Sequence, residues 1–318
     1  MKVTVVGAGG NVGSTVALSV AQRDFAKEVI AVDLERKDGD KTFYPSKGRA
    51  LDQWEASPIH LFDTRIKGTT DYADTANSDI CVITAGVPRR PGMSRDDLLE
   101  INANIVRSVT EQLVKHSPDT IIIVVSNPLD VMVQVAKDAS GLPYEKVMGM
   151  AGILDTARYR AFIADELDVS PKDIQALLMG GHGDTMVPLP RFTTLAGMPI
   201  TQFISDERLE EIVNRAKKGG GELVGLMGTS AWYAPGAAAA QMVEAILLDQ
   251  NRIFPVCAHI DGQYGIDDLY IGVPVKLGKG GIKEVIEVEL TKEESDLMHQ
   301  SAGAVRGTLN DFKKLMNK

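Results

Sequence analysis

His182 is the residue of this sequence best suited to proton transfer. It stands in the stretch LLMGGHGDTMVP, where an apolar run ends and glycines at 181 and 183 flank the ring. An imidazole titrates close to neutral pH, so one in an uncrowded loop is a candidate general acid and base. The other four histidines lack such surroundings: His60, His116, His259 and His299. A structural histidine remains the alternative, and a metal site is less favoured because no Cys or His cluster accompanies it.

A catalytic imidazole needs an orienting group on its second ring nitrogen. The stretch GILDTARYR offers Asp155 for this role and places Arg158 three residues later, on the same face of a helix. Spacing alone does not separate this pair from an ordinary helical ion pair.

Three arginines gather in the loop TAGVPRRPGMSRDD, residues 84–97, namely Arg89, Arg90 and Arg95. The prolines and glycines of this loop exclude a helix or a central strand. The chain has 43 Asp and Glu against 34 Lys and Arg, so a local cationic cluster is informative. We expect these guanidinium groups to face water or an anionic ligand.

A glycine-rich loop, VVGAGGNVGSTVA, joins the first expected strand to the first expected helix. Its residues Gly7, Gly9, Gly10, Asn11, Val12 and Gly13 are candidates for dinucleotide binding. Bare backbone beside a helix N-terminus suits a pyrophosphate, although an ordinary tight turn is the alternative. Asp33 ends the second strand, where a carboxylate accepts the ribose hydroxyls and repels a 2′-phosphate. NAD is therefore favoured, and Arg36 and Lys37 keep NADP as the minority alternative.

The elements that position these residues predict an α/β fold. Apolar runs without alternation indicate strands buried on both faces over residues 2–9, 28–34, 79–86 and 120–128. Helical stretches lie between and after them, at 13–24, 94–118 and 128–140, with Ser94 as a cap. This order predicts a Rossmann-type doubly wound parallel sheet, forming an NAD-binding domain over 1–151.

The second half reads differently and predicts an α+β catalytic and substrate domain over 152–318. We expect helices at 154–169 and 234–250, a strand at 174–190 that runs into the loop of His182, and a hairpin at 272–290. A last helix starts at Thr291, which forms a capping-box pattern with Glu294.

Composition limits the class of protein. The acidic excess argues against nucleic-acid and membrane-surface binding, because both of those partners are polyanions. Cys81 and Cys257 fit buried free thiols, not a disulfide or a metal site. No signal segment and no apolar run of membrane-spanning length is visible, so a cytoplasmic location is expected.

The combination of motifs resembles the lactate/malate dehydrogenases of 2-hydroxy acids from end to end. The matching stretches are VVGAGGNVG, AVDL, TAGVPRRPGMSRDDLLEINANI, VVSNPLDVM, GMAGILDTARYR, GGHGDTMVPL and GVPVKLG. The resemblance implies a homodimer or homotetramer and a role in central carbon metabolism, the tricarboxylic acid cycle.

The resemblance also implies roles for individual residues. His182 corresponds to the proton carrier and Asp155 to the group that holds its ring. Arg158 corresponds to the arginine that grips the substrate's C1 carboxylate, and Arg95 to the mobile-loop arginine that polarises the reacting C–O bond. Asn127 resembles the asparagine that hydrogen-bonds substrate and cofactor.

Two further positions, Asn102 and Val125, correspond to the walls of the family's cofactor cleft. Arg89 replaces the glutamine usual in lactate dehydrogenases and suits the second carboxylate of a dicarboxylate. The implied reaction is therefore the reversible oxidation of malate to oxaloacetate. Pyruvate would leave Arg89 buried and unpaired, at a cost of several kcal/mol.

The sequence departs from the family pattern at two places, and three other functions are alternatives. The glycine spacing differs from the lactate type, and the segment after Asp33 is several residues longer than usual, which bears on the choice between NAD and NADP. The rivals are a lactate or branched 2-hydroxy-acid dehydrogenase, a catalytically silent dinucleotide sensor, and an NAD-dependent glycosidase.

Overall fold

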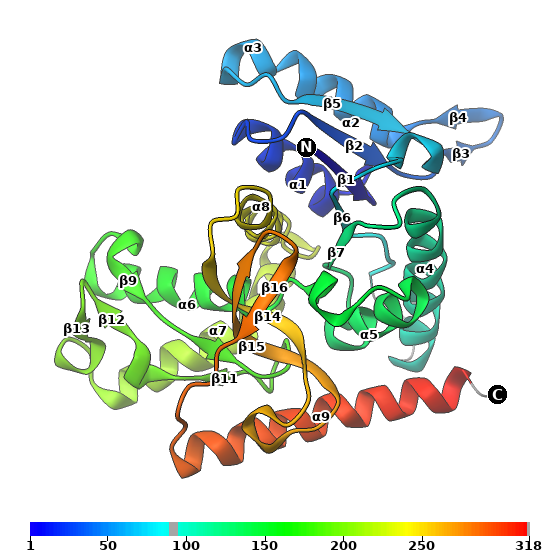
Figure 1. The fold of residues 1–318 in the computed structure, drawn as a ribbon. Helices are drawn as coiled ribbons and strands as arrows, with labels where there is room; N and C mark the ends of the chain where they lie inside the picture. The colour runs from blue at the N-terminus through cyan, green and yellow to red at the C-terminus, as the bar shows by residue number, and fades with distance from the viewer. Residues whose placement is uncertain (89–94, 317–318) are drawn as a thin grey trace.

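The computed structural model describes residues 1–88 and 95–316, and for Arg95 the backbone only. The centre of this part of the chain is a nine-stranded sheet in the order β16-β15-β14-β8-β7-β6-β1-β2-β5, flanked by helices (Figure 1). Its two kinds of strand pairing confirm the predicted fold class, a Rossmann-type sheet followed by an α+β part.

The first half supplies the parallel strands and the helices that connect them. In chain order its elements are β1 (Lys2–Val6), α1 (Asn11–Gln22), β2 (Glu28–Val32), β3 (Arg36–Asp38), β4 (Lys41–Phe43), α2 (Pro45–Glu55), α3 (Ser57–His60), β5 (Arg65–Thr69), β6 (Ile80–Ile83), α4 (Arg95–His116), β7 (Ile121–Val124), α5 (Leu129–Ser140) and β8 (Val147–Gly149). Short 3-10 turns lie at η1 (Tyr72–Thr75) and η2 (Tyr144–Lys146).

The order of the parallel strands determines where a ligand can bind. β6 and β7 are buried at every residue, as apolar runs without alternation predict. From β1 the chain steps to β2 in one direction and later to β6 in the other. Right-handed crossovers then put α1 and α2 on one face and α4 and α5 on the other. The carboxyl ends of β1 and β6 therefore meet at a topological switch point, where open α/β sheets bind ligands.

The second half extends the same sheet with antiparallel strands and adds a separate helical layer. Its elements are α6 (Gly152–Leu167), β9 (Ile174–Gln175), β10 (Leu178–Met179), β11 (Val187–Pro188), β12 (Thr194–Leu195), β13 (Met198–Pro199), α7 (Asp206–Met227), α8 (Tyr233–Leu247), β14 (Arg252–Ile260), β15 (Leu269–Gly278), β16 (Gly281–Val285) and α9 (Lys292–Met316). Its 3-10 turns are η3 (Pro171–Asp173), η4 (Pro190–Phe192), η5 (Ile200–Gln202) and η6 (Gln263–Gly265).

Contacts between the halves are extensive. β14 pairs with β8 through Cys257 and Gly149, so one sheet runs through both halves. α8 packs against α1, and α9 passes along α4 and α5 (Figure 1). The small residues of α8 serve this packing, because a Cβ at Gly236 would lie only 2.5 Å from Thr15.

Several elements match the sequence predictions and others do not. The predicted capping box is confirmed, since the Glu294 amide donates to Thr291 Oγ1 at 3.2 Å and the Thr291 amide donates to Glu294 Oε2 at 2.9 Å. The expected hairpin at 272–290 is β15 and β16. The single strand expected before the glycine-rich loop of 174–190 is present as two short pieces, β9 and β10, and left-handed Gly180 (φ +83°) then begins the loop.

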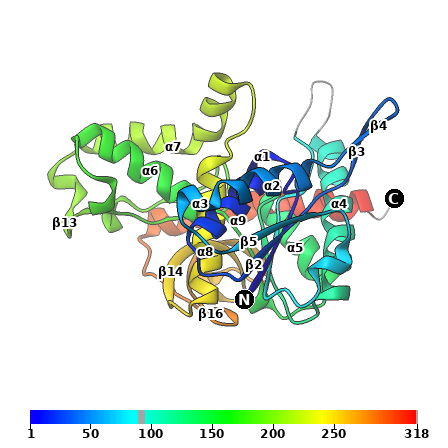
Figure 2. The ribbon, with the colours of Figure 1, turned by 90° about the horizontal axis from the view of Figure 1, so that it is seen from above.

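The lengthened segment after Asp33 forms the β3–β4 hairpin, which projects from the body of the molecule in both views (Figures 1 and 2). All six of its strand residues are exposed. Cys81 and Cys257 are buried free thiols, as predicted.

Candidate active site

The glycine loop lies between β1 and α1, and its shape depends on missing side chains. Gly7 has a left-handed backbone (φ +85°). A Cβ at Gly13 would lie 2.4 Å from the carbonyl oxygen of Gly7, and one at Gly7 would lie 2.7 Å from Thr84 Oγ1. Only glycine allows the strand, the turn and the helix to approach this closely.

The start of α1 and the end of β2 meet at this loop. The Gly9 amide donates to Asp33 Oδ2 at 2.8 Å, and the Leu34 amide donates to Asp33 Oδ1 at 2.7 Å. No described side chain caps α1, and its first turn holds no acid. Free helix N–H groups and a carboxylate at the end of β2 fit the pyrophosphate and ribose of a dinucleotide.

Asn102 and Asn127 link the middle of the cleft to the helices behind it. Asn102 is 2% exposed; its amide donates to the Asn127 carbonyl at 2.8 Å, and its oxygen accepts the Val87 amide at 2.8 Å. The Asn127–Pro128 peptide bond is cis. Asn127 and Val125 line the cavity described below, whereas Asn102 lies behind its wall and braces Asn127.

His182, Asp155 and Arg158 are brought together although the sequence separates the first from the other two. Asp155 and Arg158 lie in the first two turns of α6, and Asp155 is 2% exposed. His182 Nδ1 lies 2.9 Å from Asp155 Oδ2, while Arg158 Nη1 lies 3.5 Å from Asp155 Oδ1. The ring nitrogen Nε2 of His182 is left for a substrate, so the arrangement can move a proton beside an arginine that can bind a carboxylate.

The surroundings of His182 raise its pKa above the ordinary value for imidazole. Burial lowers the pKa, but the charge and hydrogen bond of Asp155, helped by the charge of Asp130, more than offset this effect. The charged ring is therefore favoured, as a proton donor to a ketone requires.

The loop that carries His182 is held by three other elements. Gly180 exchanges two backbone hydrogen bonds with Gly272 of β15, at 2.8 and 3.0 Å. The Gly181 amide donates to Ser301 Oγ of α9 at 2.8 Å, and the His182 amide donates to Asp130 Oδ2 of α5 at 3.2 Å. The glycines before His182 are thus explained by close approach to β15 and α9, and not by an uncrowded ring.

A cavity of about 510 Å³ extends from Val12 of the glycine loop, its candidate cofactor end, to His182, its candidate catalytic end. Val12, Val125 and Asn127 line it from the first half, and Asp155, Arg158 and His182 line it from the second. Sequence reasoning missed Lys217 and Lys218 of α7, which line the same cavity and form no ion pair with any described residue. It also missed Ser230, which precedes α8.

Asp130 is a further missed residue. Its carboxylate is buried beside the thiol of Cys257, and burial raises its pKa. The only signal for Asp130 in the sequence is its place three residues after Asn127, in SNPLD.

The arginine loop is only partly covered by the structure. Arg89 and Arg90 lie outside the described residues, and Arg95 begins α4 without a described side chain. Their predicted roles stay predictions.

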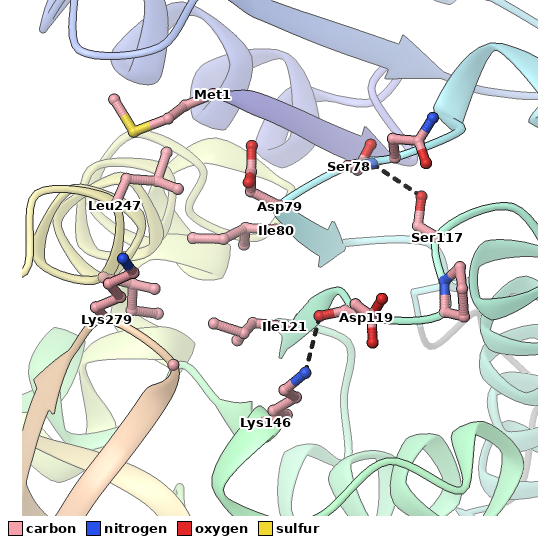
Figure 3. Close-up of a pocket in the computed structure, with 14 residues that line it drawn as sticks. Met1, Ser78, Asp79, Ile80, Ser117, Asp119, Ile121, Lys146, Leu247 and Lys279 are labelled. Atoms are coloured by element: carbon pink, nitrogen blue, oxygen red, sulfur yellow. Dashed lines mark hydrogen bonds between the residues drawn. The ribbon is translucent and has the colours of Figure 1, made fainter.

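A larger cavity, of about 620 Å³, lies at the opposite edge of the sheet, at the amino ends of β1, β6 and β7 (Figure 3). Polar groups that line it are hydrogen-bonded to each other: Lys146 Nζ donates to the Asp119 carbonyl at 3.0 Å, and the Ser78 amide donates to Ser117 Oγ at 2.9 Å (Figure 3). Open parallel sheets bind ligands at the other edge, so the cavity with His182 is the candidate active site.

Comparison with known proteins points to one family. The profile of the lactate/malate dehydrogenase NAD binding domain matches residues 1–149, and that of the lactate/malate dehydrogenase alpha/beta C-terminal domain matches 153–316. The malate dehydrogenase of Salinibacter ruber is 63% identical over 318 residues, covering 100% of this chain and 99% of that protein.

Solved structures that resemble this fold include malate dehydrogenases as well. The structure of malate dehydrogenase from Salinibacter ruber has a TM-score of 0.93 at 61% identity and covers 100% of this chain and 99% of that one. Malate dehydrogenase from Plasmodium falciparum in complex with NADH has a TM-score of 0.89 at 36% identity, covering 99% of each chain.

Proposed function

The chain belongs to the lactate/malate dehydrogenase family, and on that premise we propose that it interconverts (S)-malate and oxaloacetate with NAD, using His182 as the proton carrier. It is an oxidoreductase of the malate dehydrogenase type and works with a nicotinamide dinucleotide. The observation that carries the proposal is the 2.9 Å contact of His182 with buried Asp155, beside Arg158, in a cavity that reaches the glycine loop.

In malate oxidation, His182 Nε2 accepts the proton of the C2 hydroxyl while the hydride leaves C2. The bound nicotinamide supplies the hydride acceptor, and in the reverse direction its reduced form supplies the hydride. Asp155 fixes Nδ1 as the protonated nitrogen and stabilises the imidazolium that forms. In reverse, the imidazolium donates from Nε2 to the ketone oxygen.

Arginines bind the substrate in this proposal. Arg158 grips the C1 carboxylate through two parallel hydrogen bonds, and Arg89 takes the second carboxylate. Arg95 polarises the reacting C–O bond when the loop is closed. Lys217 and Lys218 add positive charge to the same cavity, which favours a dianion.

NAD rather than NADP is proposed because of Asp33. Its carboxylate, tied to the amides of Gly9 and Leu34, would repel a 2′-phosphate at the end of β2. Arg36 and Lys37, which could attract that phosphate, lie on the exposed β3, and Lys37 faces Glu35 at 3.4 Å.

The test is the initial rate of nicotinamide oxidation with oxaloacetate and with pyruvate, for the wild type, Arg89→Gln and Arg90→Gln. NADH and NADPH are compared in each case. We expect the wild type to prefer oxaloacetate by roughly a hundredfold or more and to prefer NADH. Arg89→Gln loses most of the substrate preference, and the matched control Arg90→Gln keeps it. Efficient pyruvate turnover by the wild type would reduce the proposal to a broad 2-hydroxy-acid dehydrogenase.

We also propose that the chain acts in the tricarboxylic acid cycle, in the cytoplasm, as a homodimer or homotetramer. Self-association is supported by large apolar side chains exposed on and beside α2 and α3, where Leu51 is 58%, Ile59 80% and Leu61 85% exposed. Light scattering on the purified protein tests it, and a monomer at micromolar concentration would refute it. None of the helices in the described ranges is long and apolar enough to cross a membrane.

A further inference from the structure

Three consecutive glycines, Gly219 to Gly221, lie in the middle of α7, a helix of 22 residues. Glycine inside a helix lowers stability relative to alanine, because the unfolded chain gains freedom and the helix gains no contact. A run of three glycines therefore lowers the stability of α7, and we looked for a local reason for each of the three positions.

The three positions have different surroundings. Gly220 and Gly221 line the cavity, and a Cβ at either would meet no described atom within 4 Å. Gly219 is buried, and a Cβ there would lie 3.1 Å from Cδ and 3.5 Å from Nε of Arg158. The stem of Arg158 thus occupies the space beside a missing side chain.

Polar contacts hold Arg158 only loosely. Its Nη1 lies 3.5 Å from Asp155 Oδ1, at the limit of a hydrogen bond, and its buried Nε has no partner among the described residues. The direction of the guanidinium therefore depends on how its stem packs against α7.

α7 packs against α6 over the stretch that precedes Gly219 (Figure 2). Tyr159 and Ile163 of α6 pack in one buried cluster with Leu209, Ile212 and Ala216 of α7.

Ionic contacts hold the far end of the same pair of helices. There Arg208 of α7 binds Glu166 of α6 with two hydrogen bonds, at 3.0 and 2.7 Å. Arg158 and Gly219 lie at the end of this interface that faces the active site. Because the cluster and the ion pair fix α7, added volume at position 219 has to be accommodated by Arg158.

We propose that Gly219 is a positioning residue, which leaves room for the stem of Arg158 and so aims its guanidinium at the substrate carboxylate. The inference rests on the proposed role of Arg158 in carboxylate binding. A methyl group at 219 shifts the arginine by a few tenths of an ångström. Two parallel hydrogen bonds to a carboxylate do not tolerate such a shift without loss.

The test compares Gly219→Ala with Gly225→Ala, which adds the same methyl group to α7 at an exposed position with nothing within 4 Å. Gly219→Ala is expected to raise the KM for oxaloacetate roughly tenfold and to leave the Kd of NADH within twofold of the wild type. Gly225→Ala is expected to leave both constants unchanged. The Tm of both variants stays equal to that of the wild type or rises by about 2–4 °C, since alanine favours a helix.

Crystal structures of the wild type and both variants supply a readout that does not need activity. We expect the Arg158 guanidinium to be displaced in Gly219→Ala alone. An unmoved guanidinium, or an unchanged KM for oxaloacetate, would overturn the proposal. So would a fall in Tm with weaker NADH binding, because alanine would then disturb α7 as a whole. If the wild type does not turn over oxaloacetate, the proposed function fails, and the crystal structures still decide whether Gly219 positions Arg158.

Discussion

The two ends of the active-site cavity are held in place by different means. At the cofactor end, backbone atoms approach so closely that side chains are excluded, as at Gly13, where a Cβ would lie 2.4 Å from the Gly7 carbonyl oxygen. At the catalytic end, polar side chains hold the site: Asp155 binds the ring of His182, and Asp130 and Ser301 accept backbone amides of its loop.

This difference has a consequence for mutation. A site made of backbone fails when atoms are added, because nothing can move aside. A site made of side chains fails when one polar partner is removed, because the other is left buried and unpaired. The cofactor end should therefore be sensitive to methyl groups, and the pair of His182 and Asp155 to isosteric changes of charge.

The largest effect is expected from His182→Gln, which should impair the catalytic end of the cavity and leave the cofactor end intact. Removing the proposed proton carrier is expected to lower kcat for oxaloacetate reduction by roughly 10³–10⁴-fold, while the Kd of NADH stays within twofold. Stopped-flow rates and NADH fluorescence titration measure the two quantities. His299→Gln, an exposed change on α9, serves as the control. A His182 variant within tenfold of the wild-type kcat would remove His182 from the mechanism.

Gly13→Ala tests the cofactor end. The added methyl forces α1 away from the turn at Gly7, so we expect the Kd of NADH to rise about tenfold or more and Tm to fall. Gly303→Ala, on α9 with nothing within 4 Å, is the matched control. Unchanged NADH binding in Gly13→Ala would mean that close packing does not define this end.

The smallest effect is expected from changes at Asp130. They test whether its hydrogen bond or its negative charge stabilises the loop of His182. Asp130→Ala leaves the His182 amide unpaired, at a cost of about 1–3 kcal/mol in the free energy of unfolding. Asp130→Asn keeps an acceptor and removes a buried carboxylate, so its stability stays close to that of the wild type. Urea unfolding measures both variants. Equal stability of Asp130→Ala and wild type would show that the contact does not hold the loop.

The same difference explains what could be predicted from the sequence. The glycine loop and Asp33 are made by neighbouring residues and strand ends, so a short string of letters indicates the site. The hydrogen bond between His182 and Asp155 is not readable from spacing, and family resemblance was needed to select Asp155. Asp130 and the lysines of α7 were missed because their approach to His182 and Arg158 is purely tertiary.

Two segments show how contacts between distant parts of the chain act on local structure. The run KKGGG weakens a helix by composition, yet α7 is continuous from Asp206 to Met227, and Leu209, Ile212 and Ala216 in its first half pack on α6. Within 174–190, Gly180 takes a left-handed backbone to pair with Gly272, which ends β10 and begins the loop of His182. In both places a contact between distant segments supports the observed local structure.

His182 is proposed to carry the proton under the influence of Asp155, and the pH profile of oxaloacetate reduction tests this role directly. Reduction needs the protonated ring, so kcat/KM falls as pH rises through the pKa of His182. Asp155 raises that pKa, and Asp155→Asn therefore lowers it. We predict that the descending limb of the profile moves to lower pH in Asp155→Asn, with NADH affinity unchanged. A limb at the same pH in both proteins would contradict the account.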